Sequence, residues 1–358
     1  MKRVLMTADT VGGVWNYALG LIRALPEIEF ALCTMGAPLS ASQGGEVSAL
    51  ENVRLFPGGY MLEWMDDPWG DVDAAGEWLL KIATEFRPDL VHLNGYAHAA
   101  LGWNAPVVLV AHSCVLSWWR AVKGENAPAR FDEYRKRVTN GLQAANVVIA
   151  PSRAMLESLR ENYKAAFTAR AIHNGCDLPR FSPPPKQAGI LAAGRVWDEA
   201  KNLRALDTVA PRAKWPIEIA GEVSAPGREP TTFQNARLLG KLSAAQLAQA
   251  MASAAIFAAP ARYEPFGLSI LEAALSSCAL VLGDIPSLRE LWHDAAIFVD
   301  PDDHPSLAAA LNRLSGDADL RQDFARRARQ RALGFSIEDM AAEYRDLYSA
   351  CSRIEVAA

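Results

Sequence analysis

The feature that most constrains the fold of this chain is a regular alternation of short apolar runs with helical stretches from one end to the other. Several runs, such as Val107–His112 and Val147–Ala150, are continuously apolar, as expected for strands that are covered on both faces. Strands that alternate with helices form a parallel, doubly wound sheet. We therefore predict an α/β fold.

The first half of the chain is predicted to form one such sheet. Its expected strands are Arg3–Ala8, Glu29–Met35, Asn52–Phe56, Asp89–Asn94, Val107–His112, Val147–Ala150 and Ala169–His173. Its expected helices include Val14–Leu25, Ala74–Phe86 and Ala127–Ala144.

A proline-rich segment, Phe181–Pro185, cannot continue a helix or a central strand and is predicted to be a stiff connector. The alternation then restarts. The expected strands are Gly189–Ala193, Ile217–Ala220, Ala236–Leu239, Ala255–Ala259, Leu280–Leu282 and Ala296–Val299, and the expected helices are Asn202–Ala210, Ala244–Ala252, Leu268–Ser276, Ser306–Leu314 and Leu320–Leu333. We predict two Rossmann-like domains, residues 1–175 and 176–335, that face each other across a cleft. Ligands of such sheets bind beyond the carboxyl ends of the strands.

Composition argues against several classes of protein. The net charge of −5 gives no electrostatic footprint for nucleic acid. No run approaches the roughly 18 uncharged residues that a membrane span needs. The five cysteines are scattered without the spacing of a metal site, which indicates a reducing compartment. We predict a cytoplasmic protein that binds no nucleic acid, and peripheral attachment to a membrane stays open.

The most informative motif is EPFGLSILE, Glu264–Glu272, which follows the expected strand Ala255–Ala259 and leads into a helix from Leu268. The unpaired N–H groups at a helix start suit a phosphate, and Gly267 lets the backbone approach a ligand closely. One turn past Leu268, Glu272 shares that helix face, and its carboxylate can accept hydrogen bonds from two adjacent hydroxyls, as on a ribose. Either acid alone is more often structural, but the two together favour a binding site.

A second motif follows the first expected strand of the same domain. Gly194 ends that strand, Arg195 projects from its carboxyl edge, and Lys201 opens the next helix. A planar guanidinium and a compact ammonium together suit a diphosphate. The competing interpretation is a surface pair matched to Asp198 and Glu199, and the position at a strand's carboxyl end favours function.

The first domain carries weaker signals. Gly12 and Gly13 precede a helix and permit an anion to approach, although a tight turn explains them about equally well. The G-x-G-x-x-G fingerprint is absent, which argues against a nicotinamide dehydrogenase. His112 can hydrogen-bond a sugar hydroxyl or carbonyl group, although a single histidine is more often bonded to backbone. Further side chains that follow strands are candidates for a sugar-stacking surface or for the core: Tyr96, His98, Trp118 and Trp119.

Together these residues resemble the retaining GT-B glycosyltransferases of family 4 over nearly the whole chain, most specifically at Glu264–Glu272. Further segments that resemble family elements are Gly12-Gly13, Gly194-Arg195 with Lys201-Asn202, Leu239-Gly240-Lys241, and Glu290 with Val299–Asp303. The resemblance implies a donor site made of Gly12, Gly13, Arg195, Lys201, Gly240, Phe266, Gly267, Leu268, Ser269 and Glu272. It implies catalytic roles for His112, Arg195, Lys201 and Glu264.

The resemblance also implies how the parts act. Arg195 and Lys201 would hold the donor diphosphate, and Glu272 the ribose. Glu264 would contact the donor sugar, and His112 would contact the sugar or the reacting centre from the opposite domain. No metal or other cofactor would be needed, because cationic side chains and a helix start neutralise the leaving diphosphate. A last helix in residues 336–358 would cross back to the first domain.

The chain departs from the family pattern at two places. Ser277–Ala279 stands where Gly-x-Pro is frequent, and Asn94 stands where a histidine is frequent. Neither position touches the expected diphosphate site. The second departure leaves the identity of the acceptor open.

We therefore predict a glycosyltransferase of polysaccharide or glycoconjugate biosynthesis. It would move a sugar, with retained configuration, from a UDP-linked donor, or second a GDP-linked one, to a glycan, lipid-linked or small-molecule acceptor. Two alternatives stay open: a sugar-nucleotide epimerase or hydrolase of the same fold, and a non-catalytic nucleotide-sugar-binding scaffold. Donor consumption without an acceptor would favour the first, and donor binding without turnover the second.

Overall fold

A computed structural model describes residues 2–177, 185–224 and 229–352. The chain divides into two compact units: unit 1 comprises residues 1–120, 125–175 and 337–358, and unit 2 comprises residues 121–124 and 176–336. The expected connector Phe181–Pro185 lies, except for Pro185, outside the described residues.

Unit 1 is built on a seven-stranded parallel sheet with the order β3-β2-β1-β4-β5-β6-β7. Its strands are β1 (Lys2–Asp9), β2 (Ile28–Met35), β3 (Val53–Pro57), β4 (Leu90–Leu93), β5 (Val107–Val110), β6 (Val147–Ala150) and β7 (Ala169–Ala171). Its helices are α1 (Gly13–Ala24), α2 (Ala41–Ser48), α3 (Trp69–Phe86), most of α4 (Val115–Lys123), α5 (Asp132–Ala144), α6 (Arg153–Tyr163) and α13 (Ile337–Cys351). The strand order reverses between β1 and β4, which makes their carboxyl ends the switch point where ligands of such sheets bind.

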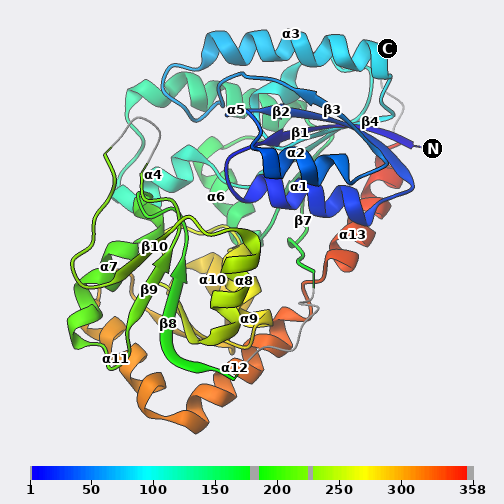
Figure 1. The fold of residues 1–358 in the computed structure, drawn as a ribbon. Helices are drawn as coiled ribbons and strands as arrows, with labels where there is room; N and C mark the ends of the chain where they lie inside the picture. Colours follow the sequence, from blue (N-terminus) through cyan, green and yellow to red (C-terminus); the bar gives the residue numbers. More distant parts are fainter. Residues whose placement is uncertain (1, 178–184, 225–228, 353–358) are drawn as a thin grey trace. The chain divides into compact units, whose positions relative to one another are not determined.

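The core of unit 1 is completed by the last helix of the chain. Along β1, Val4, Met6 and Ala8 point into a core that α1 and α13 close, because alternate residues of a strand share a face. From α13, Tyr344 and Tyr348 are fully buried in this core. Figure 1 shows α13 beside α1 and α3 over the opposite face of the sheet.

Unit 2 is built on a six-stranded parallel sheet with the order β10-β9-β8-β11-β12-β13. Its strands are β8 (Gln187–Ala193), β9 (Ile217–Ala220), β10 (Arg237–Gly240), β11 (Ala254–Ala259), β12 (Ala279–Gly283) and β13 (Ala296–Val299). Its helices are α7 (Leu203–Val209), α8 (Ala244–Ser253), α9 (Leu268–Leu275), α10 (Pro286–Trp292), α11 (His304–Gly316) and α12 (Ala318–Ala332). The switch point lies between β8 and β11.

Both faces of the second sheet are buried. Along β8, Leu191 packs in a core with α9 and α12, whereas Ile190 and Ala192 pack in a core with α7 and α11. Strands of this kind need apolar residues at every position, which is why they are continuous apolar runs in the sequence. The predicted α/β fold with two doubly wound parallel sheets is confirmed.

Several local predictions were wrong. His112 does not end a strand, because β5 stops at Val110. Lys201 does not open a helix but ends a 3₁₀ turn, because Asn202 has a left-handed backbone with φ of 53° and α7 begins only after it. Helices α2, α4, α6 and α10 were not among the helices named from the sequence; α2 contains two glycines and is held by a capping box from Ser40. Among the described residues, no helix combines the length and apolar character needed to cross a membrane.

Candidate active site

The switch point of unit 2 brings together the two loops that the sequence motifs indicated. One loop, residues 194–202, follows β8, and the other, residues 260–267, follows β11. Asn202, which is buried, joins them: its Nδ2 donates to the carbonyl of Pro260 at 2.9 Å and to that of Pro301 at 2.7 Å. Because parallel strands end at one edge of their sheet, residues more than fifty positions apart in sequence become neighbours here.

Lys201 and Glu264, both expected to be catalytic, are in direct contact. The Nζ of Lys201 lies 2.5 Å from Oε2 of Glu264, and the two side chains are 24% and 13% exposed. The loop of Glu264 is held by helix α10, because Oγ of Ser287 donates to the Glu264 carbonyl at 2.6 Å. A charged pair of this kind can be opened by an anion that offers Lys201 a stronger partner.

Arg195 is held by a buried acid. Its guanidinium lies 2.6 Å from Oδ2 of Asp198, whose side chain is only 5% exposed, and it stacks on the ring of Trp197 at 5.1 Å from the centroid. The other oxygen of Asp198 accepts from the backbone N–H of Ala200 at 3.0 Å. The competing interpretation was therefore right that Arg195 pairs with Asp198. Because that acid is buried, however, it orients the guanidinium of an arginine whose side chain remains 39% exposed.

Three glycines pack the carboxyl ends of β8, β9 and β10 against one another. The N–H of Gly221 donates to the carbonyl of Gly240 at 2.8 Å. A Cβ on Gly221 would lie 1.7 Å from the carbonyl oxygen of Gly194, and the φ of Gly221 is 149°. The sequence analysis missed Gly221, although a glycine directly after an apolar strand, as at Gly194, was the available signal.

We expect Gly221→Ala to lower the free energy of unfolding by about 3 kcal/mol, because the new Cβ overlaps a backbone oxygen at a strained φ. Urea denaturation measures the change. The matched control is Gly189→Ala on β8, where an added Cβ meets no atom within 4 Å, and a change within about 1 kcal/mol is expected. Equal stability of the two variants would show that the strand ends are not packed as described.

The start of α9 offers unpaired backbone donors. Gly267, its N-cap, has a φ of 89° and no side-chain cap. Among the described residues, no group accepts from the N–H of Leu268 or Ser269, whereas the N–H groups of the next two residues bond the Gly267 carbonyl. The expectation for Phe266 needs correction: its side chain is buried against Phe335, with ring centroids 5.7 Å apart, so only its backbone can face a ligand.

Glu272 is a half-buried carboxyl group in α9. Burial raises its pKa to about 7. Within the part of the chain that the structure describes, no group hydrogen-bonds its side chain, and none joins it to Lys201 or Glu264. A carboxylate in this state gains from any ligand that supplies hydroxyl donors.

In unit 1, the loop after β1 lies at that unit's own switch point. Gly12 has a φ of 95°, serves as N-cap of α1 without a side-chain cap, and is exposed, as is Gly13. Oδ1 of Asp9 accepts from the N–H of Val11 at 2.6 Å, which shapes the turn. The paired glycines thus stand at an open helix start.

His112 belongs to a polar cluster beneath that switch point. Its Nε2 lies 2.8 Å from Oδ1 of Asn94, and its ring packs edge-on against Tyr17, with centroids 4.5 Å apart. Burial lowers the pKa of His112 to about 3, so the ring is neutral at physiological pH. The sequence analysis weighed Asn94 only as a departure from a family pattern and did not anticipate this contact.

Tyr96 and His98 belong to the core, which was the second of the two possibilities that the sequence left for them. The hydroxyl of Tyr96 donates to the carbonyl of Ser113 at 2.7 Å, and Nε2 of His98 bonds the carbonyl of Val72 at 2.9 Å. Both side chains are buried, so neither offers a face to a sugar. Trp118 and Trp119 lie half-buried on α4.

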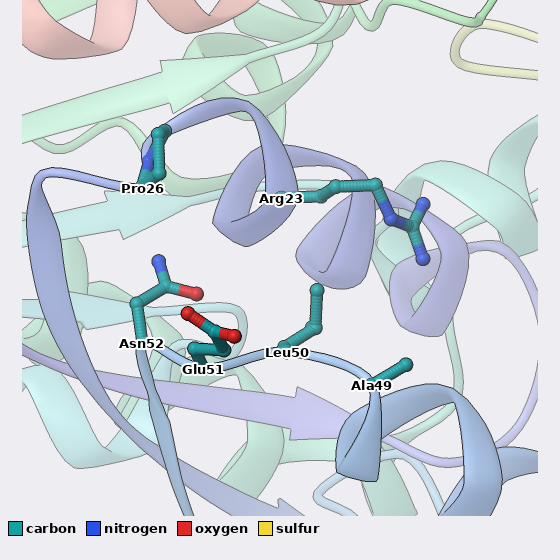
Figure 2. A pocket seen from close by; sticks show the side chains of 6 residues that line it. All are labelled: Arg23, Pro26, Ala49, Leu50, Glu51 and Asn52. Carbon is teal, nitrogen blue, oxygen red and sulfur yellow. The ribbon is translucent and has the colours of Figure 1, made fainter.

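A hollow on unit 1 lies away from these residues. Figure 2 shows its lining, Arg23 in the last turn of α1, Pro26 after that helix and the segment Ala49–Asn52 before β3. Helix α1 ends and β2 and β3 begin here, so the hollow marks the amino edge of the sheet, opposite the edge where ligands bind. We assign it no role in the reaction.

Among the residues that the structure describes, no group of three or more His, Cys, Asp or Glu side chains is placed to hold a metal ion.

The chain contains two doubly wound parallel sheets, each with a switch point of the kind where ligands bind, and comparison with known proteins identifies its class. The sequence matches the family profile of Glycosyltransferase Family 4 over residues 11–180 and that of Glycosyl transferases group 1 over residues 229–331. The chain belongs to the GT-B glycosyltransferases of family 4. It is a transferase enzyme.

Curated relatives act on different substrates. The chain is 26% identical over 341 residues to a glycogen synthase of Mycobacterium tuberculosis, covering 86% of this chain and 81% of the relative. It is 27% identical over 290 residues to an alpha-maltose-1-phosphate synthase of the same species, covering 70% and 74%. It is 25% identical over 315 residues to a D-inositol 3-phosphate glycosyltransferase of Jonesia denitrificans, covering 75% and 73%.

Solved structures share the fold at low identity. A sucrose-phosphate synthase from Thermosynechococcus elongatus matches with a TM-score of 0.80 and 17% identity, over 98% of this chain and 100% of that one. The Anabaena protein HepE, solved in complex with UDP, matches with a TM-score of 0.75 and 16% identity, over 98% and 100%.

Proposed function

We propose that this glycosyltransferase moves a sugar from a nucleoside diphosphate sugar to a glycan, lipid-linked or small-molecule acceptor with retention of configuration. The observation that carries the proposal is the convergence of Lys201, Glu264 and Arg195 at the switch point of unit 2. This edge is where doubly wound sheets bind nucleotides.

A diphosphate suits the donors at this edge. The guanidinium of Arg195 offers a planar fork, the ammonium of Lys201 a point charge, and the N–H groups of Leu268 and Ser269 a helix start. Fixed donors of this kind stabilise the charge that develops on a leaving diphosphate. In this proposal the reaction needs no metal or other cofactor.

The contacts of Lys201, Glu264 and Glu272 indicate how a nucleotide sugar would bind. A phosphate beside Lys201 would replace Glu264 as its partner and release that carboxylate toward the donor sugar. Two ribose hydroxyls would satisfy Glu272, whose carboxylate has no donor among the described residues. The leaving phosphate would then take the acceptor's proton as the acceptor attacks from the same face.

UDP is the favoured leaving group and GDP the alternative, since fold relatives such as HepE were solved with UDP. Curated relatives named glycogen synthase and D-inositol 3-phosphate glycosyltransferase support a product in polysaccharide or glycoconjugate synthesis. We also propose a cytoplasmic location, because all five cysteines lie in described residues and none forms a disulfide.

A calorimetric screen of UDP-, GDP- and ADP-sugars tests the proposal. We expect saturable binding of one nucleotide class, strongest for UDP, that is weakened in Arg195→Ala and kept in Arg237→Ala. Arg237 is a matched control because it is an exposed arginine of the same sheet, paired with Glu218 at 2.8 Å. If none of these nucleoside diphosphate sugars binds, the assignment of the donor site is wrong. Donor hydrolysis or epimerisation without an acceptor would favour the alternative enzyme, and binding without any turnover the scaffold.

A further inference from the structure

Asn94 is fixed at the end of β4 by two hydrogen bonds to β1. Its backbone N–H donates to Oγ1 of Thr7 at 2.9 Å, and its side-chain Nδ2 donates to the carbonyl of Thr7 at 2.7 Å. The second bond decides which way the side-chain amide faces. If the amide were turned round, two carbonyl oxygens would meet at 2.7 Å with no hydrogen between them.

The fixed amide determines the protonation of His112. With Nδ2 used by Thr7, it is Oδ1 of Asn94 that lies 2.8 Å from Nε2 of His112. A carbonyl oxygen only accepts hydrogen bonds, so Nε2 must carry the hydrogen. Burial lowers the pKa of His112 to about 3, so the ring holds a single proton at neutral pH and Nδ1 is bare.

A second histidine, His92, also places its Nε2 near Oδ1 of Asn94. Nδ1 of His92 lies 2.6 Å from the hydroxyl of Tyr348, and its Nε2 lies 3.3 Å from Oδ1 of Asn94. Burial lowers the pKa of His92 to about 3 as well. Nε2 of His92 also lies 3.3 Å from the hydroxyl of Tyr17, so if Tyr348 donates to Nδ1, the Nε2–H of His92 is shared between the Tyr17 oxygen and Oδ1 of Asn94. The C-terminal helix α13 therefore completes the network.

One nitrogen of this network is left without a partner. Among the described residues, none hydrogen-bonds Nδ1 of His112, although Tyr17 packs edge-on against the ring. A bare ring nitrogen can only accept a hydrogen bond. A ligand group that meets it must therefore supply a donor, and a sugar hydroxyl does so.

We propose that Asn94 is a positioning residue that holds His112 as its Nε2–H tautomer and so presents Nδ1 as a hydrogen-bond acceptor for a hydroxyl of the sugar substrate. This role rests on the proposed function of the enzyme. In this role His112 is neutral, so it places no positive charge near the diphosphate, and it does not act as a general acid.

The tautomer itself can be measured without any substrate. Long-range ¹H–¹⁵N spectra of protein labelled at its six histidines show which ring nitrogen carries hydrogen, and His112→Gln assigns the signal. We expect one Nε2–H form between about pH 5 and pH 8. An Nδ1–H form, or a charged ring in that range, would overturn the proposal even if donor binding at Arg195 is intact.

Two variants link the tautomer to catalysis. Asn94→Ala removes the acceptor, so His112 should show both tautomers, and kcat should fall about tenfold with donor Kd little changed. Asn94→Asp keeps an acceptor for Nε2 of His112 but sets a carboxylate oxygen against the Thr7 carbonyl, so it should lose stability. Its negative charge should raise the pKa of His112 and add an ionisation to the pH–rate profile.

Asn146→Ala is the control for a merely structural effect. Oδ1 of Asn146 accepts from the N–H of Val107 at 2.7 Å in the same sheet, away from His112. This variant should lose comparable stability and keep both the tautomer and kcat. If Asn94→Ala shows a single tautomer, or if its kcat falls no further than that of Asn146→Ala, the positioning role is wrong.

Discussion

Replacing Arg195 by alanine is expected to lower the rate of sugar transfer by about 10²–10³-fold while leaving the fold intact. The physical reason is that the guanidinium is oriented in advance by buried Asp198 and by Trp197, so in the proposed reaction it would stabilise the leaving diphosphate without reorganising. Its side chain is 39% exposed, so its removal leaves no cavity in the core.

Steady-state kinetics of the purified variant with the donor found in the screen measure this effect. The loss should fall mainly on kcat, because the charge on the diphosphate develops as the sugar departs. Arg195→Lys, which keeps the charge but loses the planar fork, should recover only part of the rate. Arg237→Ala should behave as wild type. Wild-type turnover of Arg195→Ala would show that the diphosphate binds elsewhere.

Glu272→Gln is expected to stabilise the protein at alkaline pH and at the same time to weaken donor binding. The folded protein holds the pKa of Glu272 at about 7 against an ordinary value of 4.5, so the folded state binds a proton that the unfolded state releases. Below pH 4.5 both states are protonated and the substitution should be neutral. As pH rises from 4.5 to 7, wild type loses stability, by at most about 3 kcal/mol above pH 7.

Denaturation of wild type and Glu272→Gln at several pH values tests this sign and window. Glu338→Gln is the control, since Glu338 is an exposed first-turn acid of α13, and its effect should be small at every pH. Donor Kd for Glu272→Gln should rise by about 10- to 100-fold, because a charged acceptor for two hydroxyls is lost. If the variant is no more stable than wild type at pH 8, burial does not raise the pKa of Glu272. If donor affinity is unchanged, Glu272 does not bind the ribose.

Much of the fold could be predicted because its strands are buried on both faces. The run Val147–Ala150 was placed without error, and Ile217–Ala220 likewise. Helix α2 was not named because its two glycines disfavour a helix, although the capping box of Ser40 and Gln43 was a local signal for it. The site was predicted in its parts, since Arg195, Lys201 and Glu264 each follow a strand. Their mutual geometry was not predictable, because sequence spacing does not specify which strands are neighbours.

The sequence by itself determined the period of the apolar runs, hence two parallel sheets, and the types of side chain that follow their strands. Those are local properties, since burial on both faces and a helix start each leave their mark on adjacent residues. Only the tertiary structure decided that β8 lies beside β11, so that Lys201 meets Glu264, and that Asn94 faces His112 with its oxygen. Such contacts depend on strand order and on the competition of nearby groups for hydrogen bonds, which no short stretch of sequence encodes.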